Sequence, residues 1–159
     1  AVTLAHAESA WPQAREVVAQ FLAEERVLGL EGPAFAAFAD RVRTLRDQLI
    51  RQLRELKAQG KRVFGYGAST KGNVILQYAG ITPELLPCIA EVNPEKFGHV
   101  TPGTHIPIIS EAEARAQRPD YFLVFPWHFR AGIVRREAAF LAGGGRLIFP
   151  LPNLEIVAA

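Results

Sequence analysis

The chain has 159 residues and a formal net charge of +2, and 49% of its residues are hydrophobic while 21% are charged. This size and composition predict a folded globular protein with one good core, and they exclude a disordered chain. The small net charge argues against a nucleic-acid partner, because the basic residues are spread along the chain without a basic face that carries aromatic platforms.

The composition also bears on location. The longest apolar run, residues 121–129, is interrupted by Pro126 and His128 and is too short to cross a bilayer. Since no charged and then apolar leader opens the chain, we expect a cytoplasmic protein without a membrane partner. Cys88 is the only cysteine, and its apolar neighbours predict a buried structural thiol. The absence of methionine and the abrupt start at Ala1 favour a piece of a longer polypeptide.

Two helices are predicted in the first part of the chain. The first covers residues 9–28, with Pro12 in its first turn and apolar residues near a 3.6-residue period. The second runs from about residue 34 to 58, and Gly60 is its natural end. Its opposite face carries mixed charge, which is typical of a solvated helix, although a basic docking surface is the alternative. We expect residues 1–60 to form a helical arm or hairpin that packs against a neighbour.

Beyond residue 60 the pattern changes to short strands that alternate with helices. Strands are predicted at residues 62–66, 88–92, 121–125 and 146–149, with an edge strand at 154–157. Helices are predicted at residues 74–78, from Ser110 to before Pro119, and at 130–141. The second of these starts with a capping box formed by Ser110 and Glu113, and residues 93–107 are predicted to be a loop. This alternation implies right-handed crossovers, so residues 61–159 are expected to form an α/β domain, a Rossmann-like three-layer sandwich with a mainly parallel sheet.

The turn after the first strand is the most informative stretch. Glycines let the backbone approach a ligand closely, and the first amides of the following helix lack internal partners, so this turn favours an anion. Neither common nucleotide motif matches, because Thr70 stands where the dinucleotide fingerprint needs a glycine and Asn73 where the Walker pattern needs a lysine. A turn without a ligand is the alternative. The crowding of polar side chains favours a binding site, for which the candidates are Gly67, Ala68, Ser69, Thr70, Lys71 and Asn73.

Residues after the later strands should converge on this turn, since ligands of such sheets bind at the carboxyl ends of the strands. Glu91 lies where a dinucleotide domain places the acid that holds a ribose, and a solvated carboxylate is the alternative. Trp127 and His128 can stack on and hydrogen-bond a base or sugar, or Trp127 can cap the core. The long polar loop is a candidate rim of the site, to which it would contribute Lys96, His99, Thr104 and His105. We expect no metal site, because the histidines show no ligand spacing.

Several blocks of the sequence resemble a known family. They are residues 65–73 (GYGASTKGN) with 80–81 (GI), 93–98 (NPEKFG), 101–107 (TPGTHIP), 119–121 (PDY) and 126–129 (PWHF). These blocks resemble the C-terminal domain of S-adenosylmethionine-dependent sugar C-methyltransferases, which act on nucleotide-linked deoxysugars. The resemblance covers about residues 15–157.

The resemblance implies a full enzyme with a zinc-binding N-terminal part, a central methyltransferase domain and this domain, which helps hold the nucleotide sugar. This chain has no four-cysteine set and no cofactor glycine loop before its helices. The resemblance therefore implies no catalytic residue, metal or bound cofactor here, with S-adenosylmethionine expected for the full-length enzyme. It implies substrate binding by Ser69, Thr70, Lys71 and Asn73, and also by Lys96, His99, Thr104, His105, Trp127 and His128.

Three interpretations follow from the sequence. The first is the substrate-binding domain of a C-methyltransferase, whose partners are a nucleotide sugar and the upstream methyltransferase domain. The second is a stand-alone module that binds a nucleotide or nucleotide sugar without catalysis. The third, a dehydrogenase domain of the NAD type, is disfavoured by the missing third glycine. If the ligand is a deoxythymidine diphosphate sugar, its nucleoside lacks a 2′-hydroxyl, so Glu91 must serve another purpose.

Overall fold

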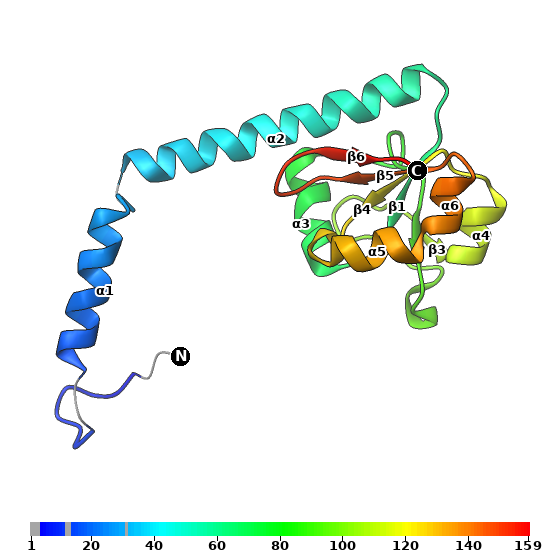
Figure 1. Cartoon of the computed structure of the whole chain (residues 1–159). Coiled ribbons are helices and arrows are strands. Elements are labelled where there is room, and N and C mark those ends of the chain that lie inside the picture. Colours follow the sequence, from blue (N-terminus) through cyan, green and yellow to red (C-terminus); the bar gives the residue numbers. More distant parts are fainter. Residues whose placement is uncertain (1–3, 12–13, 31) are drawn as a thin grey trace. The chain divides into compact units, whose positions relative to one another are not determined.

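The computed structural model describes residues 4–11, 14–30 and 32–159, which divide into two compact units (Figure 1). The first unit covers residues 1–41 and the second covers residues 42–159. Helix α2 (Pro33–Ala58) is shared, because it starts in the first unit and ends in the second. The expected organisation into an arm of residues 1–60 and a sheet domain of residues 61–159 stays a prediction.

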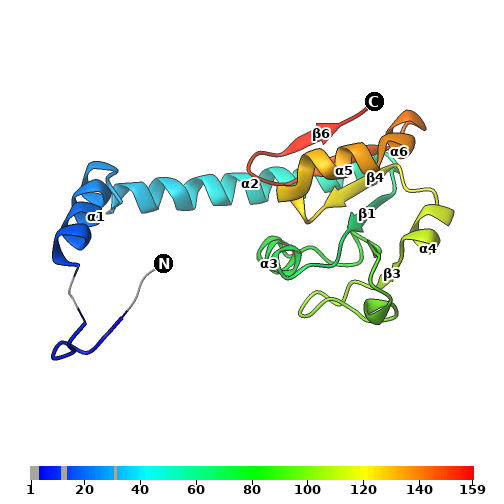
Figure 2. The ribbon, with the colours of Figure 1, turned by 60° about the horizontal axis from the view of Figure 1, so that its bottom comes forward.

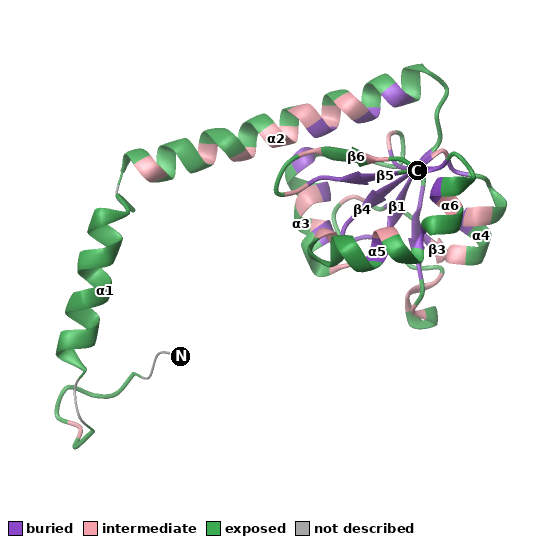
Figure 3. Cartoon of the chain, in the orientation of Figure 1, coloured by how far each residue is buried: buried purple, intermediate pink, exposed green. Residues whose placement is uncertain are grey.

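Helix α1 (Arg15–Val27) is the main element of the first unit, and it buries no residue (Figure 3). It begins later than the predicted start at residue 9, so that boundary is wrong. The amide of Trp11 donates to the Ser9 hydroxyl at 3.1 Å, which gives this segment a local turn in place of a helical hydrogen bond. Pro12, predicted to lie in the first turn, is outside the described residues.

Helix α2 provides part of the core of the second unit. Leu49, Leu53 and Leu56 are buried, as their spacing of three and four residues requires on one helix face. The predicted end is confirmed, because Gly60 adopts a positive φ of 71° and its amide donates to the carbonyl of Lys57.

The second unit is built on one six-stranded sheet in the order β3-β2-β1-β4-β5-β6. The strands are β1 (Val63–Tyr66), β2 (Ile89–Glu91), β3 (Ile108–Ser110), β4 (Tyr121–Val124), β5 (Arg146–Phe149) and β6 (Glu155–Val157). All neighbours pair in parallel except β5 and β6, which are antiparallel. Strand β3 is missing from the predictions, because its last residue, Ser110, is also the N-cap of the next helix and is assigned there to that helix alone.

Helices cover both faces of the sheet (Figures 1 and 2). They are α3 (Thr70–Ala79), α4 (Glu111–Ala116), α5 (Arg130–Arg136) and α6 (Ala138–Ala142), with short 3₁₀ turns η1 (Pro94–Lys96) and η2 (Trp127–Phe129). On one face α2 and α3 pack with Val63 and Leu123; on the other, α4, α5 and α6 pack with Phe64 and Phe122. Alternate strand residues thus enter two cores, which confirms the predicted three-layer Rossmann-like sandwich.

Local structure agrees with the sequence at one helix start and differs at another. The capping box is confirmed, because the Ser110 hydroxyl accepts from the Glu113 amide and the Glu113 carboxylate accepts from the Ser110 amide. The helix predicted at residues 130–141 is two helices with a break at Glu137. This side chain is buried and accepts hydrogen bonds from Tyr66 and Arg115, so tertiary contacts determine the backbone there.

Candidate functional site

The strand order reverses between β1 and β4, which places the expected ligand crevice at their carboxyl ends. The two loops that follow these strands meet there. A side chain at Gly67, whose φ is +80°, would lie 3.1 Å from Cδ of Pro126. Only glycine suits both that φ and that distance, so Gly67 permits the close approach of the loops.

The turn leads directly into helix α3. Ser69 is its N-cap, and the Ser69 hydroxyl accepts a hydrogen bond from the Gly72 amide at 3.1 Å. A side chain at Gly72 would lie 2.7 Å from the ring of Phe125, so glycine lets α3 pack directly over the end of β4. The amides of Thr70 and Lys71 lie in the first turn, where a helix offers no internal acceptor. They form the anion-favouring helix start that the sequence predicts.

Lys71 and Trp127 come together although 56 positions separate them in the sequence. The Lys71 Nζ lies 5.9 Å from the centroid of the Trp127 ring, a distance typical of a cation–π contact. Lys71 is exposed and Trp127 is half-buried. Among the residues that the structure describes, no carboxylate pairs with Lys71 within 4 Å. Its charge is therefore available to a ligand.

Glu91 is a buried brace for the turn, so the interpretation as a solvated carboxylate is wrong. Its carboxylate accepts from the amide of Ala68 at 2.8 Å, from those of Val92 and Asn93 at 2.8 and 3.0 Å, and from Lys96 at 3.3 Å. Burial acts to raise the pKa of Glu91, but the hydrogen bonds from Asn93, Val92 and Lys96 together lower it below its ordinary value. Its oxygens are thus occupied within the protein.

A cavity of about 240 Å³ lies beside the turn. Its walls are residues 66–69, 90–92, Lys96, Glu111, Pro126 and Arg136. The Lys96 Nζ donates to the carbonyl oxygen of Ala68 at 2.9 Å, which joins the second strand end to the turn. The cavity therefore brings Gly67, Ala68, Ser69 and Lys96 of the predicted site together.

A charged network holds the side of this cavity that α4 and α5 provide. Arg136 makes two hydrogen bonds of 2.7 Å to the carboxylate of Glu111, and it also donates to the hydroxyl of Tyr66. That hydroxyl donates to Glu137 at 2.9 Å, and Arg115 donates to both oxygens of Glu137. Burial and the adjacent Glu137 carboxylate raise the pKa of Tyr66, which therefore stays a hydroxyl donor.

The sequence matches a known protein family over most of its length. The family model described as the C-methyltransferase C-terminal domain matches residues 1–152. The chain belongs to the C-methyltransferase C-terminal domain family. The resemblance found from the sequence blocks is thus confirmed at the level of this family.

A curated relative of this C-methyltransferase C-terminal domain is the C-methyltransferase NovU from Streptomyces niveus, which is 36% identical over 148 residues. The match covers 92% of this chain and 35% of the relative. The chain thus spans about a third of the length of that relative.

The loop before β3 in this C-methyltransferase C-terminal domain is held by its own hydrogen bonds. The Thr101 and Thr104 hydroxyls lie 2.6 Å apart, and the Gln77 side chain of α3 donates to the carbonyl of Pro102 at 3.0 Å. His99 and His105 are exposed, and neither they nor Thr104 line the cavity at the turn. A binding role for these three residues stays a prediction, as it does for Asn73 and for the exposed His128.

Sequence reasoning missed Glu111 and Arg136, which line the cavity. Glu111 directly follows β3, so recognition of that strand would have placed it at a carboxyl end beside Glu91. Arg136 carries no such signal, because it lies at the end of a helix far from the turn in sequence.

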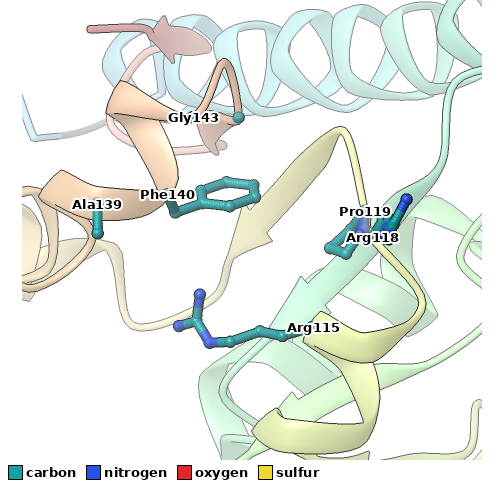
Figure 4. Close-up of a pocket in the computed structure, with 7 residues that line it drawn as sticks. Arg115, Arg118, Pro119, Ala139, Phe140 and Gly143 are labelled. Carbon is teal, nitrogen blue, oxygen red and sulfur yellow. The ribbon is translucent and has the colours of Figure 1, made fainter.

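A second hollow, of about 450 Å³, lies at the other end of the sheet (Figure 4). Arg115 and Phe140 reach it from α4 and α6, and Pro119 and Gly145 lie just before β4 and β5. A side chain at Gly145 would lie 2.4 Å from the ring of Phe140, so this glycine allows the ring to pack on the backbone. Although this hollow is larger, ligands of such sheets bind at the carboxyl ends, so we assign the candidate site to the turn.

Within residues 4–11, 14–30 and 32–159, no group of three or more His, Cys, Asp or Glu side chains is arranged to hold a metal ion. In the same part of the chain, no helix combines the length and the apolar character that crossing a membrane requires.

Proposed function

We propose that this domain binds the nucleotide-sugar substrate of an S-adenosylmethionine-dependent C-methyltransferase, and that a domain upstream transfers the methyl group to a sugar carbon. The observation that carries the proposal is the placement of Lys71, a cation without a carboxylate partner among the described residues, beside Trp127 at the start of α3. The helix start, the lysine and the aromatic ring together suit a diphosphate that is linked to rings.

The cofactor does not fit the residues of this domain. A ribose needs a carboxylate oxygen free to accept its hydroxyl groups, but those of Glu91 already accept from three backbone amides and Lys96. Thr70 stands where a third glycine would be needed. We therefore place S-adenosylmethionine in the upstream domain, and the same two observations disfavour a dehydrogenase of the NAD type. The share of NovU that lies outside the match supports an upstream domain.

The proposal is tested by calorimetry with nucleoside diphosphates and their sugar esters. We expect these ligands to bind the chain, and Lys71→Ala to weaken binding by about 1–3 kcal/mol through the loss of a charged hydrogen bond. The matched control is Lys57→Ala, which removes the same charge from an exposed position in the last turn of α2. Equal affinity in both variants would remove Lys71 from the site.

A second experiment tests the role in catalysis. The full-length polypeptide should methylate a nucleotide sugar in the presence of S-adenosylmethionine, and Lys71→Ala should raise KM for the sugar nucleotide. Calorimetry with the chain alone should show no binding of S-adenosylmethionine. Methyl transfer that does not need this domain would favour a stand-alone binding module.

A further inference from the structure

The cavity at the turn carries balanced charge, unlike the environment of Lys71. Lys96 pairs with Glu91 at 3.3 Å, and Arg136 pairs with Glu111 at 2.7 Å. Behind them Arg115 pairs with Glu137 at 2.8 Å. In the part of the chain that the structure describes, the cations around the cavity are thus matched one to one by carboxylates. The cavity has no net charge with which to attract an anion.

Hydrogen-bond donors and acceptors lie at different depths in this cavity. The side chains of Lys96 and Arg136 are 43% and 48% exposed, whereas those of Glu91 and Glu111 are 7% and 17% exposed. Lys96 donates to Ala68 and Glu91 and keeps one further N–H. Arg136 uses its terminal nitrogens on Glu111 and Tyr66, which leaves its Nε–H without an acceptor among the described residues. Donors are therefore accessible, with acceptors beneath them.

This arrangement suits an uncharged ring better than a phosphate. A diphosphate in the cavity would face Glu91 and Glu111 as well as the cations, so attraction and repulsion would nearly cancel. A ring with hydroxyl groups can accept from Lys96 and Arg136 and donate to Glu111 at the same time. The volume of about 240 Å³ is below the roughly 300–1,000 Å³ of pockets for drug-sized ligands, which suits a single ring.

On the basis of the proposed function, we infer that this cavity holds an uncharged, hydroxyl-bearing ring of the nucleotide sugar, while Lys71 and Trp127 hold the diphosphate. Two rings of such a ligand share this chemistry, namely the pentose of the nucleoside and the hexose attached to the diphosphate. Arg136 and Glu111 are then specificity residues of the substrate site.

The test uses two substitutions that change the charge of the cavity in opposite directions. Glu111→Gln makes the cavity more positive and Lys96→Gln makes it less positive, and each removes one hydrogen-bonding group. The matched controls are Glu95→Gln, an exposed acid on η1, and Lys57→Gln. The probes for calorimetry are inorganic pyrophosphate, uridine and thymidine diphosphates, and the glucose esters of both nucleotides. Melting temperatures of all variants show whether each remains folded.

We expect both cavity variants to weaken binding of a ring-bearing probe about three- to tenfold, the effect of one lost hydrogen bond, while pyrophosphate binds each as it binds the matched control. Equal weakening of the nucleoside diphosphates and the glucose esters places the pentose in the cavity. Weakening of the glucose esters alone places the hexose there. Either result supports the inference.

Opposite effects overturn it. If Glu111→Gln strengthens binding of pyrophosphate and Lys96→Gln weakens it, the cavity holds the charged part of the ligand. If neither variant differs from its control with any probe, the cavity lies outside the site. If no probe binds the unsubstituted chain, the proposed function itself fails, and the first titration shows this before any variant is compared.

Discussion

Lys71 and Lys96 lie beside the same glycine turn, but they differ in what surrounds their charge. Lys96 is tied to the Ala68 carbonyl and to the Glu91 carboxylate, whereas Lys71 rests beside the Trp127 ring with no carboxylate partner among the described residues. The comparison shows that residue type alone does not define an anion site. The neighbouring carboxylates determine which lysine can bind a charged ligand.

Removal of the Glu137 carboxylate should have the largest effect on stability. This carboxylate belongs to the network of paired charges beside the cavity. Glu137→Ala leaves Arg115 without its buried partner and Tyr66 without its acceptor. We expect a loss of about 2–3 kcal/mol in the free energy of unfolding, because the hydroxyl of the buried Tyr66 loses its acceptor and Arg115 loses a charged hydrogen bond. Denaturant unfolding followed by fluorescence measures this loss.

The control for this variant is the exposed ion pair of Arg130 and Glu155, in which a guanidinium nitrogen lies 2.5 Å from a carboxylate oxygen. Glu155→Ala should cost at most about 1 kcal/mol, since exposed ion pairs contribute little. Pyrophosphate should still bind Glu137→Ala below its melting temperature, because Lys71 is not part of the network. A similar cost for both variants contradicts a structural role of the network.

Substitution of Gly67 should separate the loops after β1 and β4, which place Trp127 beside Lys71. Gly67→Ala places a side chain at φ +80° and against Pro126, and we expect it to cost about 1–2 kcal/mol of stability. Gly80→Ala is the control, because Gly80 also has a positive φ but a side chain there meets nothing within 4 Å. Both should lower the melting temperature, while only Gly67→Ala should also weaken nucleotide binding. Retained binding in Gly67→Ala would show that the approach of the loops is not needed.

Replacement of the Trp127 ring tests the surroundings of the unpaired Lys71, and its expected effect is smaller. Trp127→Leu removes the ring beside Lys71, and we expect nucleotide binding to weaken by about 0.5–1 kcal/mol, the range of a partly exposed cation–π contact. The matched control is Trp11→Leu, since Trp11 is exposed and lies in the first unit. Calorimetry should distinguish the two variants, and equal affinities would mean that Trp127 only caps the core.

Acid should remove the stability that Glu91, the partner of Lys96, contributes to the folded state. Because the pKa of this carboxyl lies below its ordinary value of 4.5, the folded state favours the charged form. Glu91 therefore adds stability above pH 4.5, and this contribution is lost as the pH falls through the lower folded pKa. The free energy of unfolding should fall more steeply below pH 4.5 in the unsubstituted chain than in Glu91→Gln. If the free energy of unfolding falls equally with pH in both proteins, the charge of Glu91 does not stabilise the turn.

The sequence predicted well those features that depend on local signals. The capping box of Ser110 and Glu113, the end of α2 at Gly60 and the turn after β1 each depend on residues within a few positions of one another. The meeting of Lys71 with Trp127 follows from a general rule, because parallel strands bring their carboxyl ends to one edge.

Features that depend on distant partners were not predictable. The break between α5 and α6 occurs at Glu137, whose partners Tyr66 and Arg115 lie 71 and 22 positions away in the sequence. The same is true of Arg136, which reaches the cavity only because the sheet brings α5 beside the turn. Glu91 was placed correctly at a strand end, but its role as a brace depends on the folded position of Ala68 and Lys96.

The buried thiol has a practical consequence. Cys88 is the only cysteine of the chain, and it is buried in the core that contains Phe64 and Phe122. Burial raises the pKa of its thiol to about 11. At neutral pH it is therefore almost entirely protonated, and maleimide reagents should leave it untouched while the protein is folded. A new cysteine on the surface, for example at Ala131 on α5, can thus carry a fluorescent dye at a single position without prior removal of the native thiol. Such labelled protein gives an optical readout of nucleotide binding in dilute solution.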